Sequence, residues 1–181
     1  DRRVGDVSLC REGVAVASHG DYRGYRLGPG GTERWRVDLA TPVDRGDERL
    51  YAYPNHVHAT DTGVVFVTGN TYAADARETD GLHPAEHTAF GYAPDGERRW
   101  SAPVGGFAGE VGTDGDGVAV PGAQHFRRRD PDAHGLRRFG VVDGPAGTLD
   151  IDGDTVAAVE EPVAYHDGDG TVGAYRLHIV G

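Results

Sequence analysis

The chain has 181 residues, enough for one domain with a sizeable core, and it carries a formal net charge of −11. Its 18 basic residues are all arginine and face 29 acidic residues, a balance that argues against binding to nucleic acid, which needs a basic surface. No run of about 18 apolar residues occurs, so the sequence predicts no transmembrane segment, and the single Cys10 excludes an intrachain disulfide.

The composition also indicates the salt environment in which the protein works. An acidic surface without lysine keeps a protein soluble where salt screens charge strongly, and a GC-rich genome favours arginine over lysine. Together these features resemble those of a protein from a salt-loving archaeon. The chain begins at Asp1 and contains no methionine, so we expect a processed protein or a fragment. For its location we favour the extracellular space or the outer face of a membrane over the cytoplasm.

A hairpin pattern recurs four times along the chain. In each copy an apolar residue is followed seven positions later by another, with a short polar turn between them. Such self-similarity indicates a repeated structural unit. The four pairs are Val7 and Val14, Val57 and Val64, Val111 and Val118, and Leu149 and Val156.

Each hairpin leads into further segments of alternating apolar residues, which predict strands. Second strands are expected at 14–17, 64–67, 118–120 and 156–159. Third strands, each with an aromatic residue, are expected at 24–27, 89–92, 138–141 and 174–177. In the first two units a turn with Pro and Gly then leads to fourth strands at 33–37 and 97–102. No segment shows an apolar period of about 3.6 residues, so we expect very little helix.

Four short strands in a unit of about 40 to 50 residues predict an all-β fold of β-propeller blades, each a four-stranded antiparallel sheet. We expect one propeller-type domain over 1–181, with units at 1–50, 51–104, 105–146 and 147–181. The third unit leaves no room for a full fourth strand, and the fourth unit stops after its third strand. We therefore expect part of a larger ring of roughly six to eight blades, or a half that pairs with a second copy.

Two segments resemble a known repeat. Residues 24–35 and 89–100 each run from an aromatic residue through a tight turn to a tryptophan ten positions beyond that aromatic. They resemble the tryptophan-docking repeats of the quinoprotein, or PQQ-like, β-propellers. The resemblance implies that Trp35 and Trp100 pack against the neighbouring blade, together with the aromatic residues of the third strands. These aromatic residues are Tyr25, Phe90, Phe139 and Tyr175.

The PQQ-like family contains two functional groups. One consists of dehydrogenases that hold pyrroloquinoline quinone and a calcium ion, often beside a vicinal disulfide that a single cysteine cannot form. The other consists of cofactor-free scaffolds, similar to the assembly-platform lipoprotein of the outer-membrane insertion machine. The resemblance therefore implies a scaffold that binds no cofactor. A bound calcium or zinc ion is the alternative, and pyrroloquinoline quinone is not expected.

Histidines form the first candidate metal site. His56 and His58 alternate on a predicted strand, so both point to one face, where they could share a zinc ion. His83 and His87 lie in a polar insertion at 71–88 and could join them if the two segments converge. The alternatives are a variable strand position for the first pair and a solvated loop for the second.

Acidic residues form a second candidate. Asp150, Asp152, Asp154 and Glu161 have the spacing of the first, third, fifth and twelfth positions of a calcium-binding loop. The same segment is the hairpin turn of the fourth unit, so ordinary turn chemistry is the alternative. The basic triplet at 127–129 could contact an acidic partner or a phosphate, or could be neutralised by neighbouring aspartates in exposed ion pairs.

These features favour a non-catalytic propeller scaffold that binds a protein partner or a second copy of itself. Binding is expected at the loops 18–24, 69–88 and 124–136, because each connects a second strand to a third and such loops share one face. Two alternatives stay open. The chain could be part of a quinone- or metal-dependent oxidoreductase, or a calcium- or carbohydrate-binding extracellular module.

Overall fold

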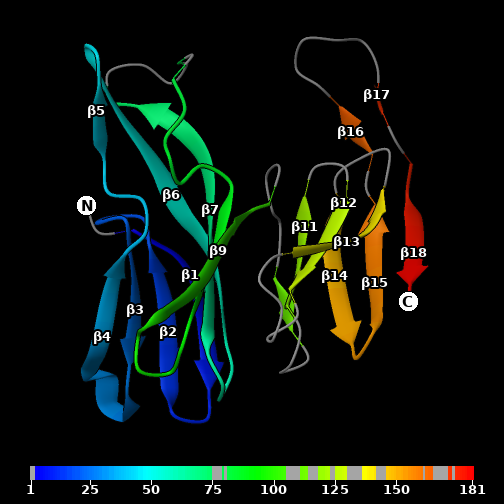
Figure 1. The fold of residues 1–181 in the computed structure, drawn as a ribbon, viewed down its shortest axis with the longest axis horizontal. Helices are drawn as coiled ribbons and strands as arrows, with labels where there is room; N and C mark the ends of the chain where they lie inside the picture. The colour runs from blue at the N-terminus through cyan, green and yellow to red at the C-terminus, as the bar shows by residue number, and fades with distance from the viewer. Residues whose placement is uncertain are drawn as a thin grey trace. The chain divides into compact units, whose positions relative to one another are not determined.

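The computed structural model is built from β-strands, and its described residues contain one three-residue 3-10 turn, Pro29–Gly31 (Figure 1). It describes residues 3–74, 79, 81–104, 111–113, 118–122, 125–129, 136–141, 146–160, 162–164, 171–172 and 174–181. The chain separates into two compact units, Asp1–Pro103 and Val104–Gly181. Within the described ranges, no helix has the length and apolar character needed to cross a membrane.

The first unit opens with a four-stranded antiparallel sheet in the order β1-β2-β3-β4. Its strands are β1 (Val4–Cys10), β2 (Gly13–Ser18), β3 (Arg23–Leu27) and β4 (Glu33–Asp38). Each strand pairs with the next along the chain, so the sheet is a simple meander. Alternating valine, alanine and tyrosine residues suit such a pleated, half-buried surface. The prediction of a four-stranded blade is confirmed here.

The second sheet of this unit has five strands, one more than predicted, in the order β5-β6-β7-β8-β9. The strands are β5 (Val43–Arg45), β6 (Glu48–Ala59), β7 (Val64–Ala73), β8 (Thr88–Tyr92) and β9 (Arg98–Pro103). The pairing of β6 with β7 shifts register on both sides of Pro54, which has no N–H to donate. Beyond this irregularity, the pair continues as a hairpin extension that carries β5 on its edge (Figure 1).

In the second unit, one sheet runs in the order β10-β11-β12-β13. The strands are β10 (Gly112–Thr113), β11 (Val118–Gly122), β12 (His125–Arg129) and β13 (Leu136–Val141). The expected lack of room for a fourth strand is wrong, because β12 lies inside the segment predicted as the loop 124–136. The basic triplet at 127–129 is therefore on a strand, paired with both β11 and β13. Phe139 consequently lies on the fourth strand instead of the third.

The last sheet has three strands, β14 (Ala146–Asp152), β15 (Thr155–Glu160) and β18 (Arg176–Val180), in that order. A separate two-stranded hairpin, β16 (Val163–Ala164) with β17 (Thr171–Val172), lies between β15 and β18 in the chain. The prediction that this unit ends after a third main strand is confirmed.

The register of β18 differs from the one expected. In the first sheet Tyr25 pairs with Val16, and the corresponding pair in the last sheet is His178 with Ala158. Tyr175 thus falls before the strand begins, where its side chain is 77% exposed. The alignment of Tyr175 with Tyr25 is wrong by three residues, because no repeated turn fixes the start of this strand.

The two sheets of the first unit share a core. Ala15 and Ala17 on β2 are fully buried, and their small side chains let β6 approach β2 closely. Gly24 on β3 has the same role, since a Cβ at this position would collide with the Phe66 ring. Polar side chains complete the junction: the N–H of Val57 donates to Asp6 at 3.0 Å. The N–H of Ala59 likewise donates to Ser8 at 2.9 Å.

Trp35 on β4 covers the outer part of this junction. Its ring centroid lies 6.4 Å from that of Phe66 and 6.0 Å from that of Tyr92, both in the second sheet. The indole N–H donates to the carbonyl oxygen of Pro94 at 2.8 Å, in the turn between β8 and β9. The tryptophan thus joins the outer strand of one sheet to the next sheet by both apolar and polar contacts.

In the second unit β14 lies against β10 and β11. Four buried residues form the described core of this unit, with Val180 packed against them. They are Leu149, Ile151, Val156 and Ala158. Fully buried Glu160, at the end of β15, forms a hydrogen-bonded network with two residues of β18: its carboxylate lies 2.8 Å from His178 and 3.3 Å from Arg176.

Trp35→Ala should destabilise the first unit, because it removes ring contacts across the junction and leaves the Pro94 carbonyl without its donor. We expect the free energy of unfolding to fall by about 2–4 kcal/mol, measured by urea denaturation. Exposed Tyr175 provides the matched aromatic control, and Tyr175→Ala should cost less than about 0.5 kcal/mol. Equal losses for the two variants would contradict the docking role of Trp35.

The Glu160 network predicts a pH dependence. The hydrogen bond from His178, followed by the Arg176 charge, lowers the pKa of the Glu160 carboxyl below its ordinary value of 4.5. The stabilisation is therefore complete above pH 4.5 and is lost as the pH falls through the lowered pKa. Thermal melts of Glu160→Gln should show a deficit at pH 7 that shrinks towards pH 3. Glu12→Gln, which breaks the exposed pair with Arg34, should lower the melting temperature less. A deficit independent of pH would contradict the charge argument.

Candidate functional site

The most distinctive surface of the first unit is a group of aromatic residues that we call the tyrosine cluster. It consists of His19, Tyr22, Tyr51, Tyr53 and Tyr72, all half-buried. Tyr51 and Tyr53 alternate on β6 and so share one face of the sheet. Tyr72 is the direct partner of Tyr51 on β7, and Tyr22 comes from the turn between β2 and β3. The cluster therefore joins both sheets of the unit.

The rings of the tyrosine cluster contact one another directly. Tyr51, Tyr53 and Tyr72 form a triangle with centroid separations of 5.2, 5.6 and 5.8 Å. Tyr22 lies 5.7 Å from Tyr51 and 6.0 Å from Tyr53. His19 stacks on Tyr53 at 4.7 Å. Such pairs each contribute about 0.5–1.5 kcal/mol beyond area burial, so the cluster is held in place before any ligand arrives.

Tyr22 has an uncommon backbone conformation, with a φ of 63° in the left-handed region. Its carbonyl oxygen accepts the backbone N–H groups of both Leu39 and Ala40, at 3.1 and 3.2 Å. These bonds anchor the turn to the segment that follows β4. Strained residues of this kind persist where surrounding contacts fix them, and they concentrate at functional sites.

Burial shifts the pKa of three side chains in the tyrosine cluster. It raises the pKa of Tyr22 and of Tyr53, with a further contribution from the neighbouring tyrosine in each case. Burial also lowers the pKa of His19, so its ring is neutral at neutral pH. The cluster presents aromatic ring faces and hydroxyl groups, which bind ligands by stacking and hydrogen bonding.

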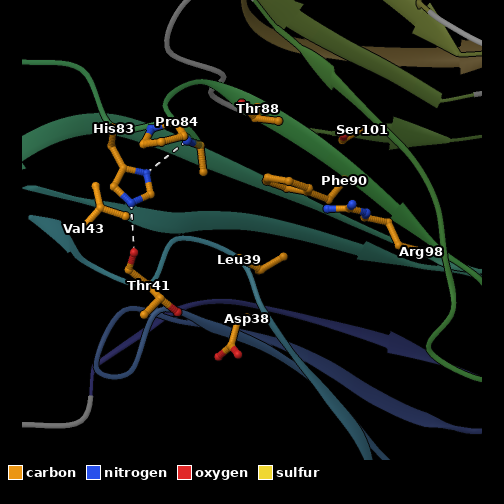
Figure 2. A pocket seen from close by; sticks show the side chains of 11 residues that line it. Asp38, Leu39, Thr41, Val43, His83, Pro84, Thr88, Phe90, Arg98 and Ser101 are labelled. Carbon is orange, nitrogen blue, oxygen red and sulfur yellow. Dashed lines mark hydrogen bonds between the residues drawn. The ribbon is translucent and has the colours of Figure 1, made fainter.

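A pocket of about 420 Å³ opens on another part of the first unit (Figure 2). Its walls combine apolar side chains with a few polar ones. They are Asp38, Leu39, Thr41, Val43, His83, Pro84, Ala85, Thr88, Phe90, Arg98 and Ser101. The pocket lies between the segment that follows β4 and the strands β8 and β9.

His83 is buried in the wall of this pocket and is held by both ring nitrogens. Nδ1 accepts the backbone N–H of Ala85 at 3.0 Å, which assigns the proton of the neutral ring to Nε2. Nε2 lies 3.0 Å from the carbonyl oxygen of Thr41, its acceptor (Figure 2). The ring therefore has no lone pair left for a metal ion or a substrate proton. This geometry disagrees with the zinc hypothesis for His83.

The structure does not bring the four candidate histidines together into a metal site. His56 and His58 share one face of β6, and His56 Nδ1 lies 3.8 Å from Asp6 Oδ2. His87 instead lies 2.5 Å from the side-chain oxygen of Asn70. In the part of the chain that the structure describes, no three His, Cys, Asp or Glu residues are placed to hold a metal ion.

The calcium candidates lie on a tight hairpin. Asp150 and Asp152 belong to β14, and Asp152 pairs with Thr155 across a turn that contains Asp154. Gly153 in this turn has a φ of 54°, a conformation that glycine adopts without strain. Two paired strands keep the backbone from wrapping around an ion, so the turn disagrees with the calcium-loop hypothesis. Glu161 lies outside the described residues.

The remaining predicted docking residues have different surroundings. Buried Phe90 belongs to the shared core of the first unit and lines the pocket. Tyr25 donates its hydroxyl to Asp21. The Trp100 indole lies over Gly91, where a Cβ would collide with it. The side chain of Phe139 lies outside the described residues.

Sequence reasoning missed the tyrosine cluster, although two of its predicted binding loops contribute to it. Tyr22 belongs to the loop 18–24, and Tyr72 belongs to the segment 69–88. The available signal was the alternation of Tyr51 and Tyr53 just before the second predicted hairpin. Period-two aromatics outside the repeat positions indicate a face other than the blade junction.

No protein-family model and no curated protein matches this chain. Among solved structures it is similar to the computationally designed Ika4 protein, with 12% identity, a TM-score of 0.64, and coverage of 99% of this chain and 92% of that one. BamB from Moraxella catarrhalis is a more distant match, with 14% identity, a TM-score of 0.34, and coverage of 96% and 61%. The likeness to Ika4 supports the fold alone. With the repeated antiparallel sheets, it agrees with an all-β protein of β-propeller-like blades.

His83→Phe keeps an aromatic ring of similar size but removes both ring hydrogen bonds. The Ala85 N–H then loses its acceptor in a buried place, so we expect the free energy of unfolding to fall by about 2–4 kcal/mol in urea denaturation. Leu82→Ala, at the exposed neighbouring position, should change it by less than about 0.5 kcal/mol. An unchanged stability for His83→Phe would contradict the structural role of this histidine.

Proposed function

We propose that the chain is a non-catalytic β-propeller module that works by binding a protein partner through the tyrosine cluster. The observation that carries the proposal is the cluster itself: four tyrosines and a histidine in mutual contact on a half-exposed surface. Tyrosine is enriched at the centres of protein interfaces, because its large rigid ring loses little conformational entropy on binding.

The position of the tyrosine cluster supports the same proposal. It combines Tyr22 from the connection of β2 to β3 with residues of the β6–β7 hairpin extension. Connections held by a rigid sheet are common binding elements, since they vary without disturbing the core. The backbone hydrogen bonds from Leu39 and Ala40 to the Tyr22 carbonyl hold Tyr22 in its place in the cluster before a partner binds. This lowers the entropic cost of binding.

The pocket favours binding over catalysis. His83 uses both ring nitrogens in structural hydrogen bonds, and Asp38 forms an ion pair with Arg23 at 2.7 Å. Acid–base catalysis requires a free acid or base next to the reacting group. Neither His83 nor Asp38 is placed in that way. This supports the scaffold over the oxidoreductase alternative.

The charge of the chain completes the proposal. A net charge of −11 without lysine suits a surface that stays soluble in concentrated salt, so we place the module in a saline environment. Salt at that level screens ionic attraction between exposed groups. An aromatic surface with neutral hydroxyls keeps its affinity there, because stacking and apolar burial need no charge.

Affinity isolation from the source cells in concentrated salt tests the proposal. The tagged wild-type chain should recover a defined partner protein, and Tyr51→Ala and Tyr72→Ala should each lower its recovery at least about tenfold, the effect of losing one interface hot spot. Leu82→Ala, an exposed apolar position on the same unit but outside the cluster, is the matched control and should retain the partner. Thermal melts of each variant verify folding.

Two outcomes would overturn the proposal. One is a partner whose recovery does not depend on Tyr51 or Tyr72. The other is a glycan array on which the wild-type chain binds a sugar while the two tyrosine variants do not. The second outcome would replace the scaffold by the carbohydrate-binding alternative, since aromatic rings also stack on sugar faces.

A further inference from the structure

The single cysteine of the chain lies beside a buried arginine in the first unit. Cys10, at the end of β1, is half-buried and packs against the core shared by the two sheets. Arg26 on β3 is only 5% exposed, and its Nη2 donates a hydrogen bond to Cys10 Sγ. The pair therefore places a sulfur atom and a positive charge in direct contact at the junction of the sheets.

The alternation of β1 explains why Cys10 faces this junction. Asp6, Ser8 and Cys10 share one side of the strand, and all three are half-buried. Asp6 and Ser8 accept backbone N–H groups of β6, which ends at Ala59. Cys10 is the next residue in this row, beyond the last residue of β6, and its sulfur accepts the guanidinium of Arg26 instead.

The charge of Arg26 is incompletely paired. Among the residues that the structure describes, no carboxylate forms an ion pair with it, and its Nη1 is buried without a hydrogen-bond acceptor. A buried donor without an acceptor costs free energy, because water no longer solvates it. Nη1 and Nη2 belong to one planar guanidinium, so the unused donor lies next to the one that contacts the sulfur.

The blade fold does not require this pair. In the second sheet the residue at the register of Cys10 is Thr60, and the residue at the register of Arg26 is Gly91. That sheet forms without a sulfur or a buried charge at these positions. An unsatisfied buried group that the architecture does not need calls for a chemical explanation.

We propose that Cys10 is a site of oxidation by hydrogen peroxide and that Arg26 holds the product, a sulfenic acid. The sulfur attacks one peroxide oxygen, so an S–O bond forms and the O–O bond breaks. The thiol proton leaves with the second oxygen as water, the sulfur loses two electrons, and the peroxide is reduced. The guanidinium stabilises the negative charge on the departing oxygen, and Nη1 donates to the oxygen that stays on the sulfur.

The surroundings of Cys10 favour a reaction that stops at the first oxygen. Oxidation to the sulfinic and sulfonic acids needs further peroxide molecules to reach the sulfur. Core side chains pack against it, and Arg26 with the first oxygen covers it further. The chain has no second cysteine that could convert the sulfenic acid to an intrachain disulfide. The sulfenic acid should therefore persist in the folded chain.

Peroxide treatment followed by intact mass spectrometry tests the proposal. The chain has one cysteine and no methionine, so the oxygen atoms gained report on Cys10. The folded wild type should gain one oxygen, and dimedone, a reagent specific for sulfenic acids, should convert the product to a stable adduct. The same chain unfolded in urea should be oxidised further, because Arg26 no longer lies beside the sulfur. Cys10→Ser should gain no oxygen and form no adduct.

Arg26→Gln tests the part played by the guanidinium. The yield of the dimedone adduct relative to the sulfinic and sulfonic products should fall about tenfold, the worth of one charge-assisted hydrogen bond. Arg34→Gln, which removes an exposed arginine charge from the neighbouring strand β4, is the matched control and should keep the wild-type yield. Circular dichroism verifies folding.

Three outcomes would overturn the proposal. They are a folded wild type that gains no oxygen, a folded wild type that is oxidised beyond the first oxygen as readily as the chain in urea, and an unchanged yield in folded Arg26→Gln. If Arg26→Gln does not fold, the comparison of the folded and unfolded wild type decides alone. None of these outcomes bears on binding at the tyrosine cluster.

Discussion

Contact between consecutive sheets is the constraint on which the first unit depends. Alanines at 15 and 17 and the missing side chain of Gly24 make room for β6 and for the Phe66 ring. Asp6 and Ser8 then satisfy N–H groups of β6 that face the junction, so burial does not leave them without acceptors. A single antiparallel sheet of four short strands buries little by itself, and stacking against a neighbour supplies the core.

The sequence was sufficient to predict the blades, because the spacing of Val7 and Val14 recurs at Val57 and Val64, again with a short polar turn between the two. It was insufficient for the later strands. Residues 127–129 lie on β12, where neighbouring strands supply the pairing, and an arginine-rich segment shows no apolar alternation to reveal it. The start of β18 was misplaced because its aromatic residue, Tyr175, precedes the strand. Turn geometry and the apolar pattern set the register of a strand, and no repeated turn precedes this one.

The candidate site was predictable only in its location. The loops around Tyr22 and Tyr72 were expected to bind, but which side chains meet there depends on the hairpin extension of β6 and β7 and on the register break at Pro54. For the histidines, the residues were predicted but their role was not. His83 suggested a metal ligand from its residue type, whereas its burial and two hydrogen bonds make it a structural element of the pocket wall. Residue type indicates chemistry, and the surrounding bonds decide whether that chemistry is available.

Amide hydrogen exchange resolved by residue tests the junction most directly. The N–H groups of Val57 and Ala59 should exchange slowly at every protein concentration, because Asp6 and Ser8 bind them within the chain. Fast exchange at Val57 and Ala59, at rates typical of exposed loops, would contradict the account.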